Sequence, residues 1–294
     1  MLGLNLSLCT KRWVTPVLWA PLVRGMGVGT VQFSFDLVDP TWPGALVDRL
    51  ADELRHIAAN EGVAMHSAFI GLAHYTHCQL LHPDPGVRDV AEHWMRCAYR
   101  FAGRAGIRGV GGPLGAIESR PDGQEPDAIP ATDYADLVVR LHRLSEAAAS
   151  EGLDTLYIEP TPMRREWPWT VAQAQRMAAD LAGAALPWRW CLDWGHGTVA
   201  PLYGQAASME PWLATLAPDV GLLHLQQTDG QADRHWDFTE SGMVEPAVIA
   251  GQLASHGLQD RPVFLEVFYP FERPDAAVLQ GVARSVELLR PHFA

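Results

Sequence analysis

The chain has 294 residues, 48% of them apolar, and a formal net charge of -12. Its length and composition allow a large buried core, and its acidic charge repels a phosphate backbone, which argues against a nucleic-acid partner. The longest apolar runs are far shorter than the roughly 18 residues of a membrane span, so no membrane segment is predicted. Cys9, Cys78, Cys97 and Cys191 lack C-x-x-C spacing. Unpaired thiols of this kind indicate a cytoplasmic location.

The first residues, MLGLNLSLCTKRW, lack the basic start and long apolar stretch of a secretion signal, and they predict a strand. Seven further apolar or alternating runs also predict strands, and a helical segment follows each one. The predicted strands are residues 2–9, 30–38, 63–69, 107–112, 156–159, 189–193, 220–225 and 263–267. The predicted helical segments are residues 16–26, 43–60, 84–104, 132–152, 170–182, 210–216, 246–255 and 275–289.

Most of these strands are continuous apolar runs, which is typical of parallel strands that are buried on both faces. Strict alternation of strand and helix over eight units predicts an α/β fold, namely a (β/α)8 TIM barrel formed by one domain of residues 1–294. A doubly wound open sheet is the alternative. It would normally carry a glycine fingerprint after the first strand, and LNLSLCTKRW has none.

Four strands end in polar residues that packing does not require: Glu159, Asp193, His224 and Glu266. All strand C-termini of a barrel surround one mouth, where active sites lie. Three carboxylates in an apolar pore repel one another unless a cation joins them, so we predict one divalent metal ion. Oxygen ligands with one nitrogen favour Mn²⁺ or Mg²⁺, whereas more imidazole would favour Zn²⁺. Each residue alone could instead be a salt-bridge partner, a helix cap or a core histidine.

Further polar residues lie near the same strand ends. The segment Leu222–Thr239 is dense in them, and its Asp233 and His235 form either a loop network or a second metal site. Lys11 and Arg12 follow the first strand, where they could capture an anion or be surface charges. The candidates for contact with a substrate are His196, Lys11, Arg12, His66, Gln226, His235 and Arg165.

At these positions the chain resembles the xylose-isomerase-like sugar isomerase and epimerase superfamily. The resemblance rests on Glu159, Asp193, His224 and Glu266, with His196 in an Asp-x-x-His pattern. Within that superfamily the chain looks most like the D-erythrulose 1-phosphate 3-epimerases. The supporting stretches are KRW at 11–13, VQFSFDLVDP at 31–40, HSAFIGLAHYTH at 66–77, LLHPD at 80–84, HLQQTDG and HWDFT within 224–239, and PFERPD at 270–275.

The resemblance implies a metal-dependent isomerase that acts on a small sugar or sugar phosphate, with a possible homo-oligomeric state. We expect C3 epimerisation of a short ketose phosphate through an enediolate, with Glu159 and Glu266 as acid and base. A proton shuttle on one face would give aldose–ketose isomerisation instead. A metal-dependent keto-sugar dehydratase or lyase and a non-catalytic metal-binding barrel are the other hypotheses. Endonuclease IV, with three zinc ions, is a more distant relative, but Gly111-Gly112-Pro113 replaces one expected histidine and the acidic charge opposes DNA.

Overall fold

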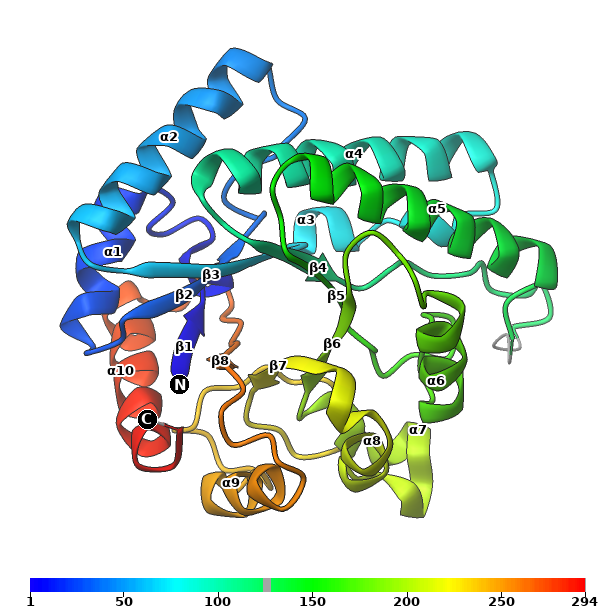
Figure 1. The fold of residues 1–294 in the computed structure, drawn as a ribbon. Helices are drawn as coiled ribbons and strands as arrows, with labels where there is room; N and C mark the ends of the chain where they lie inside the picture. Colours follow the sequence, from blue (N-terminus) through cyan, green and yellow to red (C-terminus); the bar gives the residue numbers. More distant parts are fainter. Residues whose placement is uncertain (124–127, 294) are drawn as a thin grey trace.

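The computed structural model describes residues 1–123 and 128–293 and forms one closed barrel. The strands follow one another around the barrel in sequence order, every neighbouring pair is parallel, and β1 pairs with β8 to close the ring (Figure 1). The predicted (β/α)8 barrel is therefore confirmed, and the open sheet is excluded. The predicted domain bounds include residues 124–127 and 294, which lie outside the described part.

The strands are short and end where the chain turns outward at the mouth of the barrel. At β1, the side chain of Asn5 accepts a hydrogen bond from the amide of Ser7 and begins a 3-10 turn, η1 (Leu6–Cys9), so this strand is shorter than predicted. The strands are β1 (Leu2–Asn5), β2 (Thr30–Ser34), β3 (Ala64–Phe69), β4 (Gly109–Gly112), β5 (Thr155–Ile158), β6 (Trp188–Asp193), β7 (Val220–Leu225) and β8 (Val263–Leu265).

Helices surround the barrel, and local signals set several of their ends (Figure 1). At α4, Asp84 caps the first turn and Gly106, with a φ of 80°, ends the helix. Thr170 and Gln173 form a capping box at the start of α6. The helices are α1 (Pro16–Gly25), α2 (Gly44–Asn60), α3 (Leu72–Tyr75), α4 (Pro85–Ala105), α5 (Ala131–Ser150), α6 (Val171–Asp180), α7 (Ala200–Tyr203), α8 (Glu210–Leu216), α9 (Pro246–Ser255) and α10 (Asp275–Phe293). None of the helices in the described part is long and apolar enough to cross a bilayer.

A small apolar layer fills the inside of the barrel, separate from the larger core between the strands and the helices. It consists of Phe69, Tyr157, Cys191, Leu222 and Phe264. Four of these residues lie two positions before Glu159, Asp193, His224 and Glu266, respectively. Because side chains two apart on a strand point to the same face, the layer is the floor on which the candidate site rests.

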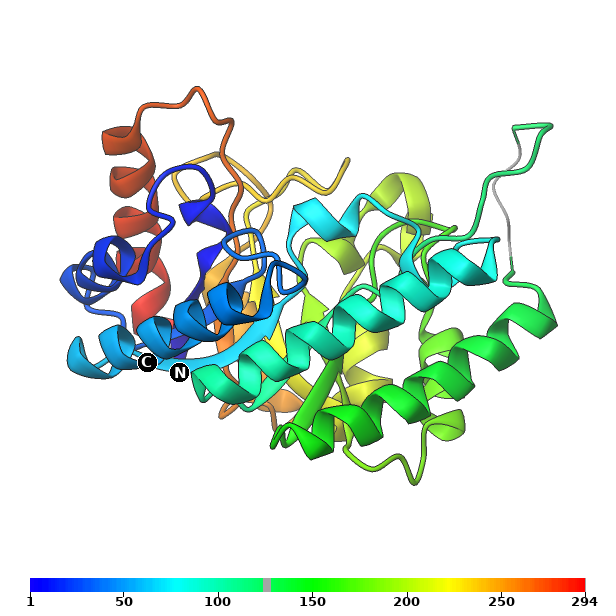
Figure 2. The same ribbon diagram turned by 90° about the horizontal axis from the view of Figure 1, so that it is seen from above.

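The packing of α4 against α5, which run side by side in Figure 2, gives a test of the fold. A Cβ added at Gly103 of α4 would overlap the backbone carbonyl oxygen of Glu151, whereas a Cβ at the exposed Gly25 of α1 meets nothing within 4 Å. We expect Gly103→Ala to lower the free energy of unfolding by about 1–3 kcal/mol through overpacking. Gly25→Ala should raise it by up to about 1 kcal/mol because alanine favours a helix. Urea unfolding measures both, and equal effects would contradict this packing.

Candidate active site

The structure brings the four strand-end residues together at the mouth of the barrel. Glu159 and Glu266 directly follow β5 and β8, Asp193 ends β6, and His224 lies in β7. One ligand atom from each residue lies within 4.8 Å of the other three, and all four side chains are buried. Four segments separated by up to 107 residues, from 159 to 266, thus form one compact cluster of acidic groups around an imidazole.

The imidazole of His224 is the centre of this cluster. Its Nδ1 atom lies 2.9 Å from Glu159 Oε1 and 2.9 Å from Glu266 Oε2. Its Nε2 atom lies 2.7 Å from Gln32 Oε1, an oxygen that also accepts a hydrogen bond of 2.7 Å from the Asn5 side chain. We therefore assign a proton to Nε2, which donates to Gln32, while Nδ1 faces the two carboxylates.

The negative charge of the two carboxylates in this cluster has to be balanced. Burial acts to lower the pKa of His224, but Cys191, Glu266 and Glu159 outweigh it and hold that pKa well above its ordinary value. Burial raises the pKa of Glu159. At Glu266 burial also acts to raise the pKa, but the facing imidazole outweighs it, so this pKa is lowered. Either a proton on His224 or a metal ion must balance the two carboxylates.

A buried acceptor without a partner gives a further reason to place an ion here. Asp193 Oδ1 accepts hydrogen bonds from the His196 amide and from Gln226, but Oδ2 is buried and accepts none from the described residues. A buried acceptor of this kind is costly unless a donor or an ion satisfies it. Three carboxylates and one imidazole nitrogen are suitable ligands for a divalent ion, so the residues fit the predicted metal.

A second cluster lies beside the first and is built around Asp233. Its Oδ2 atom is 3.2 Å from His196 Nε2 and 3.2 Å from His235 Nε2. Gln226 donates to both Asp233 and Asp193 and thereby joins the two clusters. At His235, burial acts to lower the pKa, but Asp233 outweighs it and raises the pKa to about 9.

Two of the residues predicted to contact a substrate, Lys11 and Arg12, have partners in the loop after β8 instead. Arg12 donates to the carbonyls of Pro270 and Phe271 and pairs with Asp275 at 3.0 Å. The ammonium of Lys11 lies 4.2 Å from the centre of the Phe271 ring. These two cations therefore join the loop after β1 to the loop after β8.

The two remaining candidates are not members of the cluster. The ring of His66 packs 5.2 Å from the ring of Phe264, against the floor of the barrel. Arg165 lies in the loop after β5, where its guanidinium is 3.8 Å from the Met163 sulfur.

A cavity of about 120 Å³ opens above the cluster, and both Glu159 and Glu266 line it together with His196, Asp233 and His235. A larger cavity of about 460 Å³ is lined by His74, His77 and Trp94. The residues of α3 contribute to both. We centre the candidate site on the smaller cavity because Glu159 and Glu266 both line it.

Sequence reasoning missed a buried carboxylate, Glu166, that supports two residues of the cavity wall, Tyr75 and Thr161. Glu166 is buried, and its carboxylate accepts hydrogen bonds from Tyr75 at 3.0 Å and from Thr161. Burial raises the pKa of Glu166. None of these residues ends a strand, and Tyr75 lies 91 positions from Glu166, so no local pattern indicated that they would meet.

The fold and the site define a barrel enzyme whose mouth holds a buried acidic and imidazole cluster. No family model matches the chain. A solved structure from Rhodospirillum rubrum ATCC 11170, named provisionally as a xylose isomerase, is 35% identical, covers 99% of this chain and 98% of its own, and has a TM-score of 0.92. The D-erythrulose 1-phosphate 3-epimerase of Brucella abortus (strain 2308) is 24% identical over 305 residues, which cover 99% of this chain and 96% of that protein.

The D-psicose 3-epimerase of Clostridium cellulolyticum H10 shares the fold, with a TM-score of 0.75 at 14% identity and 99% coverage of both chains. The 35% identity over nearly the whole chain decides the family. The chain belongs to the xylose isomerase-like sugar isomerase and epimerase family, and it is an enzyme of the isomerase class.

The hydrogen bonds that join His224 to Gln32 and Gln32 to Asn5 lead to a prediction about metal binding. We expect Gln32→Leu to weaken Mn²⁺ binding by about 10- to 100-fold, because the imidazole loses the acceptor that fixes its tautomer. Ser67→Ala is the control, because Ser67 contacts the amide nitrogen of Gln32, at 3.1 Å, and not the oxygen that faces His224; its other side-chain contact is His66 Nδ1. Paramagnetic resonance of free Mn²⁺ measures both affinities, and thermal unfolding checks that the variants are folded. An equal loss in the two variants would contradict this role of Gln32.

Proposed function

We propose that this enzyme is a divalent-metal-dependent epimerase that inverts C3 of a short ketose phosphate such as erythrulose 1-phosphate. The observation that carries the proposal is that Glu159 and Glu266 both lie 2.9 Å from one imidazole nitrogen and both line the same cavity. Epimerisation needs two acid–base groups beside one carbon atom, and this pair supplies them. The full-length similarity to the Brucella abortus enzyme supports the choice of substrate.

Glu159, Asp193, His224 and Glu266 would hold one ion, with Mn²⁺ or Mg²⁺ favoured over Zn²⁺ because most of the ligands are oxygens. A bound ion supplies Lewis acidity to the carbonyl and the neighbouring hydroxyl of the sugar and so favours loss of the proton between them. Asp233 and His235 were the candidates for a second ion. We assign them to substrate contact instead, because two imidazoles and Gln226 already surround the Asp233 carboxylate.

The proton transfers are assigned to the two glutamates. One carboxylate takes the proton from C3, and the electron pair of the broken C–H bond moves into the enediolate formed with the C2 carbonyl. The other carboxylate returns a proton to C3 on the opposite face. Glu159 and Glu266 suit these roles because β6 and β7 separate their strands, so they enter the cavity from different sides. Asn5 donates to Glu266 Oε1 at 2.7 Å and so directs Oε2 toward the reacting centre.

The neighbouring imidazoles position the substrate. His196 Nδ1 lies 2.9 Å from the carbonyl oxygen of Pro160 and donates to it, which fixes the ring and directs Nε2 into the cavity. With a raised pKa, His235 is protonated near neutral pH and can hold a negatively charged or hydroxyl oxygen. At His196, burial acts to lower the pKa, but Asp193 and Asp233 outweigh it and hold that pKa well above its ordinary value. Among the residues that line the cavity in the described part, these two rings can carry positive charge, so we assign them to the oxygens of the sugar or of its phosphate.

Exchange with solvent tests the reaction. In D₂O with Mn²⁺, we expect erythrulose 1-phosphate to gain deuterium at C3 and to be converted to its C3 epimer, because the returned proton comes from a carboxylate that exchanges with water. Nuclear magnetic resonance of the product measures both. A panel of tetrulose and pentulose phosphates with Mn²⁺, Mg²⁺ and Zn²⁺ establishes the preferred substrate and ion. Loss of water or an aldose product would instead indicate a dehydratase or an aldose–ketose isomerase.

Substitution of each glutamate tests the two-base scheme. Glu159→Gln and Glu266→Gln should each lower kcat by about 10²–10⁴ because a proton donor or acceptor is lost. Glu146→Gln, on the exposed face of α5, is the matched control and should leave kcat unchanged. Steady-state kinetics with saturating Mn²⁺ gives the comparison. Full activity of either active-site variant would rule out the scheme.

A further inference from the structure

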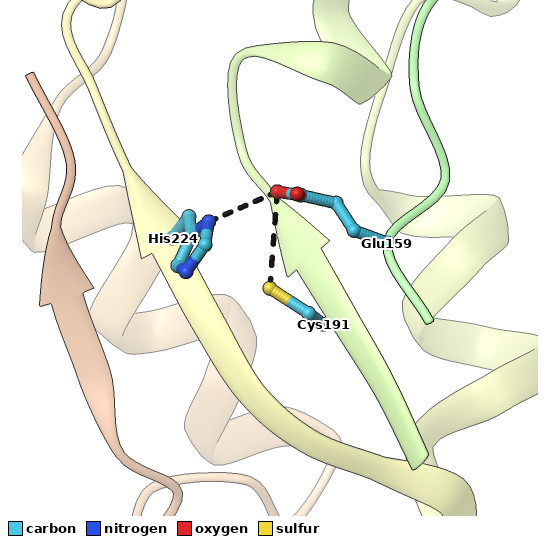
Figure 3. Close-up of side chains that lie close together, drawn as sticks. All are labelled: Glu159, Cys191 and His224. Carbon is cyan, nitrogen blue, oxygen red and sulfur yellow. Dashed lines mark hydrogen bonds and ion pairs between the residues drawn. The ribbon is translucent and has the colours of Figure 1, made fainter. Parts of the chain in front are cut away.

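Cys191 lies directly beneath the candidate metal cluster. Figure 3 shows its sulfur facing the same carboxylate oxygen of Glu159 that His224 contacts. The sulfur lies 3.9 Å from that oxygen, and the imidazole Nδ1 lies 2.9 Å from it. One ligand atom from each of the three residues lies within 4.8 Å of the others, and all three side chains are buried.

We propose that Glu159, Cys191 and His224 form a second, deeper metal position that takes a thiophilic divalent ion such as Cd²⁺ or Zn²⁺. This inference rests on the proposed function, because the deeper position shares Glu159 and His224 with the proposed catalytic ion. The two positions exclude each other. An ion at the mouth has Asp193 and Glu266 as additional ligands, whereas an ion one layer deeper has the cysteine sulfur.

The spacing of the three ligand atoms suits a small tetrahedral ion. With Zn–S of about 2.3 Å and Zn–N or Zn–O of about 2.0–2.1 Å, a tetrahedral site places neighbouring ligand atoms roughly 3.5 Å apart. Two of the three observed separations, 3.9 Å and 2.9 Å, lie on either side of that value, and all three ligand atoms lie within 4.8 Å of one another. Only small side-chain movements are therefore needed to enclose such an ion.

The surroundings of Cys191 favour a soft ion over a hard one. Cys191 belongs to the apolar floor with Phe69, Leu222 and Phe264, and none of these four side chains is more than 2% exposed. Mg²⁺ and Mn²⁺ prefer oxygen ligands and water, and the side chains of Phe69, Cys191, Leu222 and Phe264 offer no oxygen, whereas thiolate ligands select Zn²⁺ and other soft ions. A soft ion that binds there displaces the thiol proton, which leaves to solvent.

Spectroscopy of the full-length protein tests this position without relying on turnover. We expect one equivalent of Cd²⁺, added to protein freed of metal with a chelator, to produce the ultraviolet charge-transfer band of a Cd–thiolate bond. Cys191→Ser should abolish the band and weaken Cd²⁺ binding about tenfold or more, by analogy with the loss of other metal-site partners. Cys97→Ser is the matched control, because Cys97 also lies beside an imidazole, 3.6 Å from His93 Nε2, but outside this cluster. It should keep the band.

Two further measurements, the ¹¹³Cd resonance and Mn²⁺ binding, distinguish failure of the deeper position from failure of the proposed function. The ¹¹³Cd resonance of the unsubstituted protein should lie in the range of sulfur-ligated cadmium, which tests the position even if Cys191→Ser does not fold. A resonance in the oxygen and nitrogen range, or a band that survives in Cys191→Ser, overturns the inference. Mn²⁺ binding to the unsubstituted protein is measured separately. Retained Mn²⁺ binding without a thiolate band rejects only the deeper position, whereas absence of Mn²⁺ binding contradicts the proposed function itself.

Discussion

The contact of two buried carboxylates with one imidazole nitrogen is the constraint on which the site depends. Glu159 and Glu266 each lie 2.9 Å from His224 Nδ1, in a part of the barrel that water reaches poorly. Burial of ionised groups costs several kcal/mol per ion unless opposite charge compensates it. The fold therefore holds these groups in a position that only a proton or a cation can stabilise. Such a position suits chemistry in which protons are exchanged beside a carbonyl group.

The barrel provides this position through two layers of side chains with strand periodicity. The lower layer is apolar and contains Tyr157, Cys191, Leu222 and Phe264. The upper layer is polar, and its members lie two residues further along the same strands. The packed apolar layer fixes the position of the polar groups along the barrel axis. The closed ring of strands fixes the distances between these groups. Cys191 differs from its neighbours on the floor because its sulfur lies 3.9 Å from Glu159 and so connects the apolar layer to the polar one.

Residues from the first strands hold the groups contributed by the last strands. Asn5 contacts both Gln32 and Glu266, and Gln32 in turn contacts His224. The loops after β1 and β8 are joined in a similar way by Arg12, which is bound to Asp275 and two carbonyls. The cations that follow the first strand thus strengthen the closure of the barrel. Among the described residues that line the cavity, the imidazoles His196 and His235 are then the groups that can carry positive charge.

The sequence by itself determined the alternation of strands and helices, the closed barrel and the four residues at the strand ends. These features follow from local periodicity and from the rule that parallel strands bring their C-terminal ends to one mouth. Only the tertiary structure decided which other residues orient these four side chains. Asn5 and Glu266 are 261 positions apart, and Tyr75 of α3, which donates to Glu166, is 91 positions from it. Such contacts arise from ring closure and loop packing, which leave no periodic signal in the chain.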